Sequence, residues 1–170
     1  ANYTVYKKIV FLNFKKNGFS AAALYCMMTP FITFWLGEEF LLSNNVLIVL
    51  VVNFYMLGMR SSIGTFKDAA GIFYEDRFIP IIESVINVIA SLILVQFLGI
   101  LGVFIGTFLS SLIVVFYSLP HFVFQRLFGQ KKMQYYKLYF KYALITFIGV
   151  LTTILPYRFI SLTAGFPNII

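Results

Sequence analysis

The sequence predicts an all-α membrane protein, a polytopic helical bundle of about five spans plus a partial sixth. Of its 170 residues 61% are hydrophobic and only 11% are charged, and the mean hydropathy is +0.91. A water-soluble fold needs a polar shell that this composition does not supply. Only helices or closed barrels satisfy the backbone in lipid, and the apolar runs lack the two-residue alternation of barrel strands. Helical spans are therefore expected throughout.

The longest apolar stretch, residues 78–120, carries one formal charge, Glu83. About 20 apolar residues cross the hydrocarbon layer of a bilayer, so this stretch is too long for one span. We expect two spans with a break at 96–99, where Gly99 follows Leu98. The stretch is therefore interpreted as a tight transmembrane helical hairpin around which the other segments are arranged.

The other segments flank this hairpin on both sides. Residues 1–16 combine two lysine pairs with apolar positions at helical spacing, which predicts an amphipathic segment lying on the membrane surface. Residues 64–77 are balanced in charge and are expected to form a short connector. The chain opens with Ala1 and ends inside an apolar segment, so we expect a fragment of a longer protein. The predicted spans are 18–37, 43–63, 78–97, 99–119 and 140–156, with a partial span over 159–170.

The formal net charge of +7 is compatible with nucleic-acid binding, but the distribution of the basic residues along the chain indicates a membrane topology instead. Lys and Arg occupy the gaps between apolar runs instead of one amphipathic face. Basic residues favour the cytoplasmic side because its leaflet is anionic. This rule places 1–16, 64–77 and 121–139 in the cytoplasm, and the turn at 38–39, the turn at 96–99 and Arg158 outside.

Two polar residues in the second predicted span, Asn53 and Arg60, are seven apart and share one helix face. A guanidinium within the membrane suits bidentate phosphate binding, so Arg60 is a candidate for holding a diphosphate headgroup. The alternative is that Arg60 ends its helix at the cytoplasmic boundary as a topology anchor. The sequence leaves both open.

The third predicted span carries Glu83, Asn87 and Ser91 at four-residue spacing, so one side of this helix is polar. A carboxylate left alone in lipid costs several kcal/mol, and Glu83 should therefore face protein, water or a cation. The alternative is a glutamate that reaches the cytoplasmic interface. In the fourth span, Gly102, Gly106 and Ser110 form a small-residue ridge that predicts close helix packing.

The sequence contains no recognisable motif for covalent chemistry. It has no paired-carboxylate motif for Mg²⁺, no cluster of His and Cys, and no nucleophile with a base at a recognisable spacing. His121 is the one histidine and lies at a predicted boundary. We therefore expect no enzyme activity, no metal and no cofactor.

Several short stretches, taken in order, resemble bacterial polysaccharide flippases, the O-antigen and capsule repeat-unit exporters of the multidrug, oligosaccharidyl-lipid and polysaccharide flippase superfamily. Each is weak alone, and their order and spacing carry the resemblance. They are WLGEE at 35–39, NFY at 53–55, TFKDAAG at 65–71, ESVIN at 83–87 and LGILGVFIGT at 98–107.

This resemblance implies the second, C-terminal lobe of a two-lobe flippase in the bacterial cytoplasmic membrane. The implied substrate is an undecaprenyl-diphosphate-linked oligosaccharide, moved by alternating access for surface polysaccharide synthesis. In that mechanism Arg60 would hold phosphate, while Glu83, Asn53 and Asn87 would meet sugar hydroxyls or a coupling cation. Other implied partners are the lipid bilayer, the missing N-terminal lobe and a polysaccharide polymerase, with no nucleic acid. The alternatives are a cation-coupled multidrug exporter of the same superfamily and a non-transporting membrane scaffold for polysaccharide synthesis.

Overall fold

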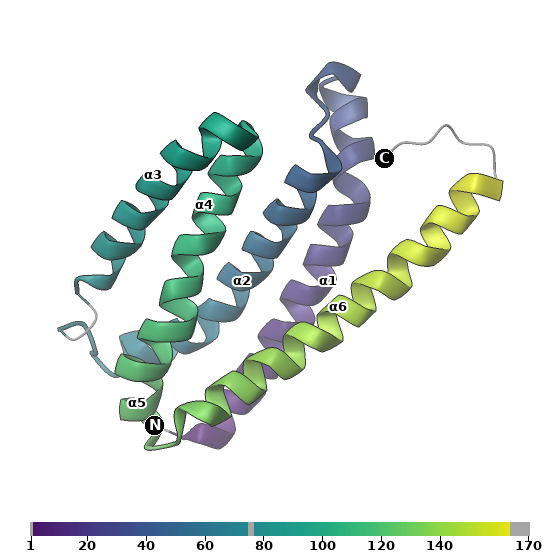
Figure 1. Ribbon diagram of the computed structural model, residues 1–170. Helices are drawn as coiled ribbons and strands as arrows, with labels where there is room; N and C mark the ends of the chain where they lie inside the picture. The colour runs from purple at the N-terminus through teal and green to yellow at the C-terminus, as the bar shows by residue number, and fades with distance from the viewer. Residues whose placement is uncertain (1, 75–76, 164–170) are drawn as a thin grey trace.

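The computed structural model describes residues 2–74 and 77–163, and in this part of the chain every regular element is a helix (Figure 1). The predicted class, an all-α membrane bundle, is confirmed. Within these described ranges, four helical segments are long and apolar enough to cross a membrane. They are Tyr3–Trp35, Asn44–Ala69, Ile79–Leu98 and Ile100–Phe128.

The first helix, α1 (Tyr3–Trp35), is continuous over 33 residues. The prediction of a separate surface segment over 1–16 was wrong, because no residue between 3 and 17 breaks the helix. Asn2 caps the helix, and its Oδ1 accepts the backbone N–H of Thr4 at 2.9 Å. At 1.5 Å per residue α1 is about 50 Å long and exceeds the roughly 30 Å hydrocarbon layer. Its lysine-bearing first half therefore projects beyond the apolar layer.

After the 3₁₀ turn η1 (Glu38–Phe40), α2 (Asn44–Ala69) also runs past its predicted end. Residues 64–69, expected in a connector, are its last turns. They stay helical because Ile63 is buried and the Phe66 ring packs against Tyr6 at 5.6 Å between centroids. The helix stops where Gly71 takes a positive φ of 66° and Ile72 N–H donates to the carbonyl of Lys67.

The predicted hairpin is formed by α3 (Ile79–Leu98) and α4 (Ile100–Ile113). The break falls at Gly99, within the expected 96–99, with φ 58° and ψ −140°, a conformation that L side chains rarely adopt. Gly102, Gly106 and Ser110 are buried, and the two glycines lie against Leu94 and Ser91 of α3. A Cβ on Gly102 would lie 2.3 Å from the Leu94 carbonyl carbon, so the predicted close packing is confirmed.

Residues 121–139, which lie between two predicted spans, are mostly helical. The π-helical segment η2 (Val114–Phe124) continues α4 and leads into α5 (Gln125–Phe128). Pro120 lacks an N–H and crowds the carbonyl four residues earlier, which favours the wider helix. That carbonyl, on Phe116, accepts the Tyr136 hydroxyl of the last helix at 2.7 Å.

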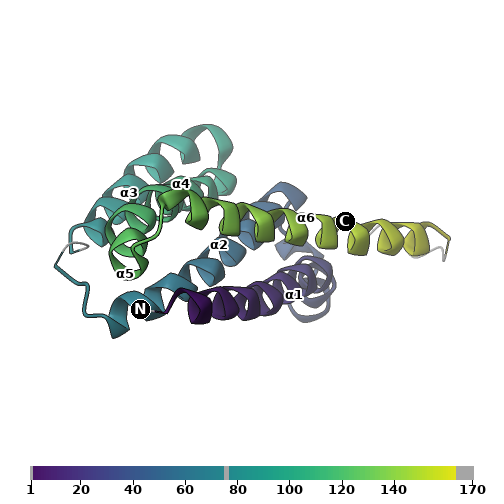
Figure 2. The same cartoon turned by 90° about the horizontal axis from the view of Figure 1, so that it is seen from below.

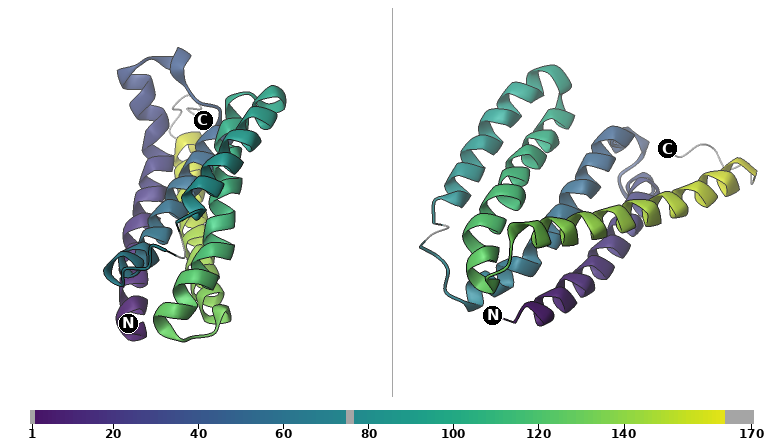
Figure 3. Two further views of the ribbon diagram at one scale, coloured as in Figure 1. Left: turned by 90° about the vertical axis from the view of Figure 1, so that its left-hand side faces the viewer. Right: turned by 60° about the horizontal axis from the view of Figure 1, so that its bottom comes forward.

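The last helix, α6 (Lys132–Thr163), contains the predicted span 140–156 and begins eight residues earlier. Residues 159–163 continue it, so the partial sixth span does not start as a new helix at 159. Residues 164–170 lie outside the described residues. Figure 3 shows the turn after α1 and the tip of the α3–α4 hairpin at one end of the bundle, with the chain's N-terminus at the other.

An aromatic cluster fills the bundle at the N-terminal end. Tyr6 lies 4.8 Å from Phe128 between ring centroids, and Phe124 lies 5.5 Å from Tyr135. No residue of α3, by contrast, is buried. Burying apolar surface is favourable only against water, so we infer that the aromatic cluster lies outside the hydrocarbon layer. Its members are Tyr3, Tyr6, Phe66, Phe124, Phe128 and Tyr135.

Gly106→Ala should lower the melting temperature of the purified protein in detergent. The new Cβ would lie 2.3 Å from Ser91 Oγ and 2.8 Å from the Ser91 backbone N. Overpacking of this kind costs about 1–3 kcal/mol. Gly64→Ala is the matched control, because nothing lies within 4 Å of its Cβ position in α2, and it should keep or raise the melting temperature. Equal melting temperatures for both variants would contradict the close approach of α3 and α4.

Candidate functional site

The four sequence-predicted site residues come from α2 and from α3, which is one arm of the hairpin that α2 packs against. Arg60 and Asn53 lie on one face of α2, as predicted. Arg60 contacts Glu83 of α3, and the Asn53 side-chain amide donates to the carbonyl of Phe104 in α4 at 2.9 Å. Thus α2 carries two polar groups whose partners both belong to the α3–α4 hairpin.

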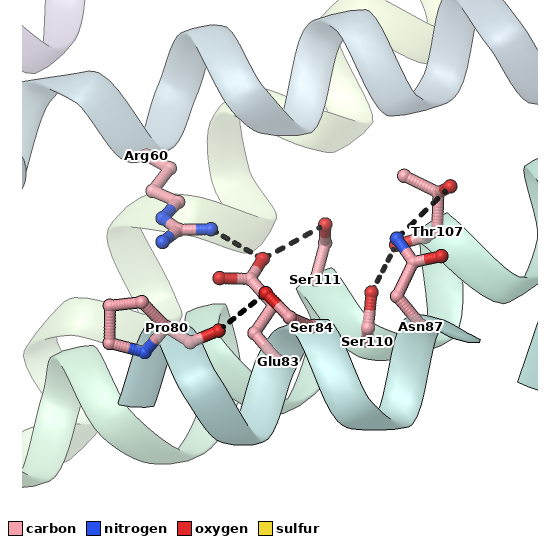
Figure 4. A network of polar contacts seen from close by, with 8 residues as sticks. All are labelled: Arg60, Pro80, Glu83, Ser84, Asn87, Thr107, Ser110 and Ser111. Carbon is pink, nitrogen blue, oxygen red and sulfur yellow. Dashed lines mark hydrogen bonds and ion pairs between the residues drawn. The ribbon is translucent and has the colours of Figure 1, made fainter. Parts of the chain in front are cut away.

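The centre of the site is an ion pair in which Arg60 Nη1 donates to Glu83 Oε1 at 2.7 Å (Figure 4). The Ser111 hydroxyl of α4 lies 3.5 Å from the same carboxylate oxygen. The Arg60 and Glu83 side chains are 27% and 19% exposed, so the pair remains reachable from outside the bundle. An unpaired charge in an apolar surrounding is unfavourable, and each group supplies the counter-charge that the other needs.

This pairing answers one expectation and changes another. Glu83 was expected to face protein, water or a cation, and it faces the guanidinium of Arg60. Arg60 was a candidate for holding phosphate, and here its charge is already matched by a carboxylate. An anion at Arg60 therefore has to compete with Glu83.

Asn87 lies inside the hairpin interface, one turn further along α3. Its amide nitrogen donates to Thr107 Oγ1 at 3.3 Å, and its amide oxygen accepts the Ser91 hydroxyl at 3.1 Å. The polar face predicted for α3 thus points mainly at α4. Asn87 holds α3 against α4 beside the ion pair.

Asn53 differs from Asn87 because one of its polar atoms lacks a partner. Its Oδ1 is buried and accepts no hydrogen bond in the part of the chain that the structure describes. A buried carbonyl without a donor is unfavourable by about 1–3 kcal/mol. A ligand hydroxyl or a water molecule that donates to Oδ1 would remove this penalty.

A second polar contact region, between α1 and α2, was missed at the sequence level. Asn13 Nδ2 donates to Ser62 Oγ at 2.8 Å. Asn17 is only 4% exposed and lies against Gly58. A Cβ added to Gly58 would lie 2.3 Å from Asn17 Cγ. The available signal was the spacing of Asn13 and Asn17, four apart on an otherwise apolar helix face.

The chemistry that these groups support is non-covalent. The described residues include no group of three or more His, Cys, Asp or Glu side chains that could hold a metal ion. A guanidinium, a carboxylate, amides and hydroxyls can exchange hydrogen bonds and counter-charges with a polar ligand. The arrangement is therefore suited to reversible binding of a polar or anionic group.

Comparison with known proteins gives no assignment: no family model, no curated protein and no solved structure matches this chain. The resemblance to polysaccharide flippases therefore stays a prediction from the residues. Any functional proposal must depend on the bundle, its apolar helices and the Arg60–Glu83 pair.

The ion pair predicts a coupling between Arg60 and Glu83 in a double-mutant cycle. Arg60→Gln and Glu83→Gln should each lower the free energy of unfolding by about 1–3 kcal/mol, because each leaves a charge without its partner. The double variant should recover much of this loss, as measured by chemical denaturation in detergent micelles.

Ser84→Ala is the control for this cycle, because Ser84 is exposed and its hydroxyl donates to the Pro80 carbonyl of its own helix. Its stability should match that of the starting protein. Strictly additive effects of the two Gln substitutions would contradict the pairing.

Proposed function

We propose that this chain is part of a transporter that moves a diphosphate-linked, oligosaccharide-bearing lipid across the bacterial cytoplasmic membrane by alternating access. The observation that carries the proposal is the partly exposed Arg60–Glu83 pair between α2 and α3, inside a bundle that is otherwise strongly apolar. The pair stands where the apolar part of these helices begins, and ionisable groups that face the inside of a membrane bundle usually serve binding or transport.

The chemistry of Arg60 supports a phosphate ligand. A guanidinium presents N–H donors in a planar fork that matches two phosphate oxygens. Among the described contacts, its bond to Glu83 uses only Nη1. A diphosphate carries more than one negative charge and offers several acceptor oxygens, so it can compete with a single carboxylate.

This competition connects binding to movement. Glu83 is on α3 and Arg60 is on α2, so a phosphate that takes the guanidinium removes a polar link between α2 and the hairpin. Alternating access requires such helix groups to change their contacts around the substrate. Under this proposal the ion pair is the link that holds the ligand-free arrangement.

The neighbouring groups support the oligosaccharide part of the ligand. The buried Oδ1 of Asn53 has no donor among the described residues, and a sugar hydroxyl is a suitable donor. Asn53 and Arg60 are seven residues apart, about 10 Å along α2. This spacing allows one ligand to place a phosphate at Arg60 and a sugar at Asn53.

Transport should depend on the guanidinium itself. With the chain expressed together with any flanking sequence that its gene encodes, Arg60→Lys should display less surface polysaccharide than the unchanged protein in a flippase-deficient strain. An ammonium keeps the charge and loses the fork. Display is measured at matched expression, and Ser84→Ala, which leaves the ion pair intact, should display normally.

A charge reversal separates a transport role from a structural one. The double variant Arg60→Glu/Glu83→Arg keeps an ion pair between α2 and α3, so it should fold, but it moves the guanidinium to the other helix and should not restore display. Normal display by Arg60→Lys or by the reversed pair would overturn the phosphate role. Arg60 would then be a topology anchor and structural partner.

The proposed orientation gives a separate prediction. After replacement of Cys26 by Ala, a cysteine at Glu38 should react with a membrane-impermeant thiol reagent added outside whole cells, and a cysteine at Lys131 should not. The basic ends of α1, α2 and α6 share one end of the bundle, which the positive-inside rule assigns to the cytoplasm (Figure 1). Labelling in the opposite sense would reverse the topology.

A further inference from the structure

The surface shared by α1 and α6 carries positive charge without any acid. All six acidic residues of the chain lie between Glu38 and Glu83, so neither helix has one. Lys15 and Lys16 on α1 are exposed, as are Lys137 and Lys141 on α6. The two helices run in the same general direction and lie against one another over their first halves (Figure 2).

An aromatic stack fixes how these lysines are placed. The ring of Tyr142 on α6 stacks on Phe14 of α1 at 4.7 Å and lies 6.2 Å from Phe11. Lys15 Nζ lies 4.6 Å from the centre of the Phe11 ring, and Lys141 Nζ lies 5.9 Å from the centre of the Tyr142 ring. Two ammonium groups from different helices thus flank one stack of rings.

Helix geometry places both lysines on the same side of the helix pair. Phe14 and Tyr142 point at each other across two helices that run in the same direction. Lys15 comes one residue after Phe14, and Lys141 comes one residue before Tyr142. One residue rotates the side-chain direction by about 100° around the helix axis, and here the rotation has opposite senses on the two helices, so both lysines point to the same side of the helix pair. Asn13 and Asn17 point to the other side, where α2 packs. The lysines therefore share a face that α2 does not cover.

The same face becomes apolar after the lysines, in the direction in which α1 and α6 both run. Phe19, four residues after Lys15, is 78% exposed. Ile145 and Ile148, four and seven residues after Lys141, are 43% and 52% exposed. Two positive charges next to an apolar strip match a molecule with an anionic head and hydrocarbon chains.

The depth of Lys15 and Lys141 in the membrane is also suited to binding a molecule with an anionic head. After Lys16 the remainder of α1 has no charged residue, and after Lys141 α6 has none before Arg158. Lys15 and Lys141 therefore stand where the apolar part of each helix begins, at the level of lipid headgroups.

We propose that Lys15 and Lys141, with the aromatic stack between them, form a binding site for the phosphate of an anionic phospholipid headgroup. The phosphodiester accepts hydrogen bonds from both ammonium groups and removes their mutual repulsion. The acyl chains lie along Phe19, Ile145 and Ile148. The site is on a different face from the Arg60–Glu83 pair and does not depend on transport.

The test measures binding of phosphatidylglycerol to the protein in detergent, by titration of the lipid against the melting temperature. Lys15→Gln/Lys141→Gln should bind roughly thirty-fold more weakly, since each lysine near an anionic lipid contributes about 1 kcal/mol and 1.4 kcal/mol is tenfold. The control Lys8→Gln/Lys131→Gln removes the same charge about 10 Å or more further from the apolar layer and should bind normally. Phosphatidylcholine should give little shift.

Two further measurements complete the test. Lys15→Arg/Lys141→Arg keeps both charges and should keep lipid binding. Inorganic phosphate at the same concentration should not raise the melting temperature, because it lacks the acyl chains. Equal loss of binding in the Gln pair and its control, loss in the Arg pair, or an equal shift with inorganic phosphate would overturn the site.

Discussion

Within a lipid bilayer apolar helices gain no hydrophobic free energy by meeting, and this constraint decides how the bundle is held together. The α3–α4 hairpin shows the consequence. Its two helices approach through Gly102 and Gly106, where backbones come close enough for extensive dispersion contact. The hairpin is joined to α2 through polar bonds, from Asn53 to the Phe104 carbonyl and from Arg60 to Glu83. The contacts most sensitive to change inside the membrane are therefore small or polar.

The class and the hairpin could be predicted from sequence because they follow from local facts. A long run with one charge must be membrane-embedded, and Gly99 permits the backbone conformation that reverses the chain. The ends of the helices could not be predicted as well. Hydropathy reports where the apolar layer ends, whereas α1, α2 and α6 continue past it because their next turns pack around the aromatic cluster. The lysines of residues 1–16 fit a surface helix and a projecting helix equally well.

The candidate site shows the same limit. Each of Arg60, Glu83, Asn53 and Asn87 could be selected because polar groups in apolar helices need partners. Their pairing could not be predicted, because Arg60 and Glu83 are 23 residues apart on different helices and meet only through tertiary packing. The hydrogen-bond partner of Asn87 could not be predicted from the sequence either, since a polar face on α3 can point at a cavity or at α4. It points at Thr107.

The register between α1 and α2 connects the two regions of positive charge. Asn13 bonds Ser62, and Asn17 lies against Gly58, so in this antiparallel pair Lys15 stands level with Arg60. The Arg60–Glu83 pair and the face with Lys15 and Lys141 therefore lie at the same depth along the bundle, on different faces of it. Beyond that depth towards the N-terminal end, the helices carry a buried aromatic core, as expected of a part that meets water. Lys15, Lys141 and Arg60 thus lie near one plane across the bundle. On one side of this plane the helices meet through small and polar residues, as in lipid, and on the other side they enclose a buried aromatic core, as in a soluble protein.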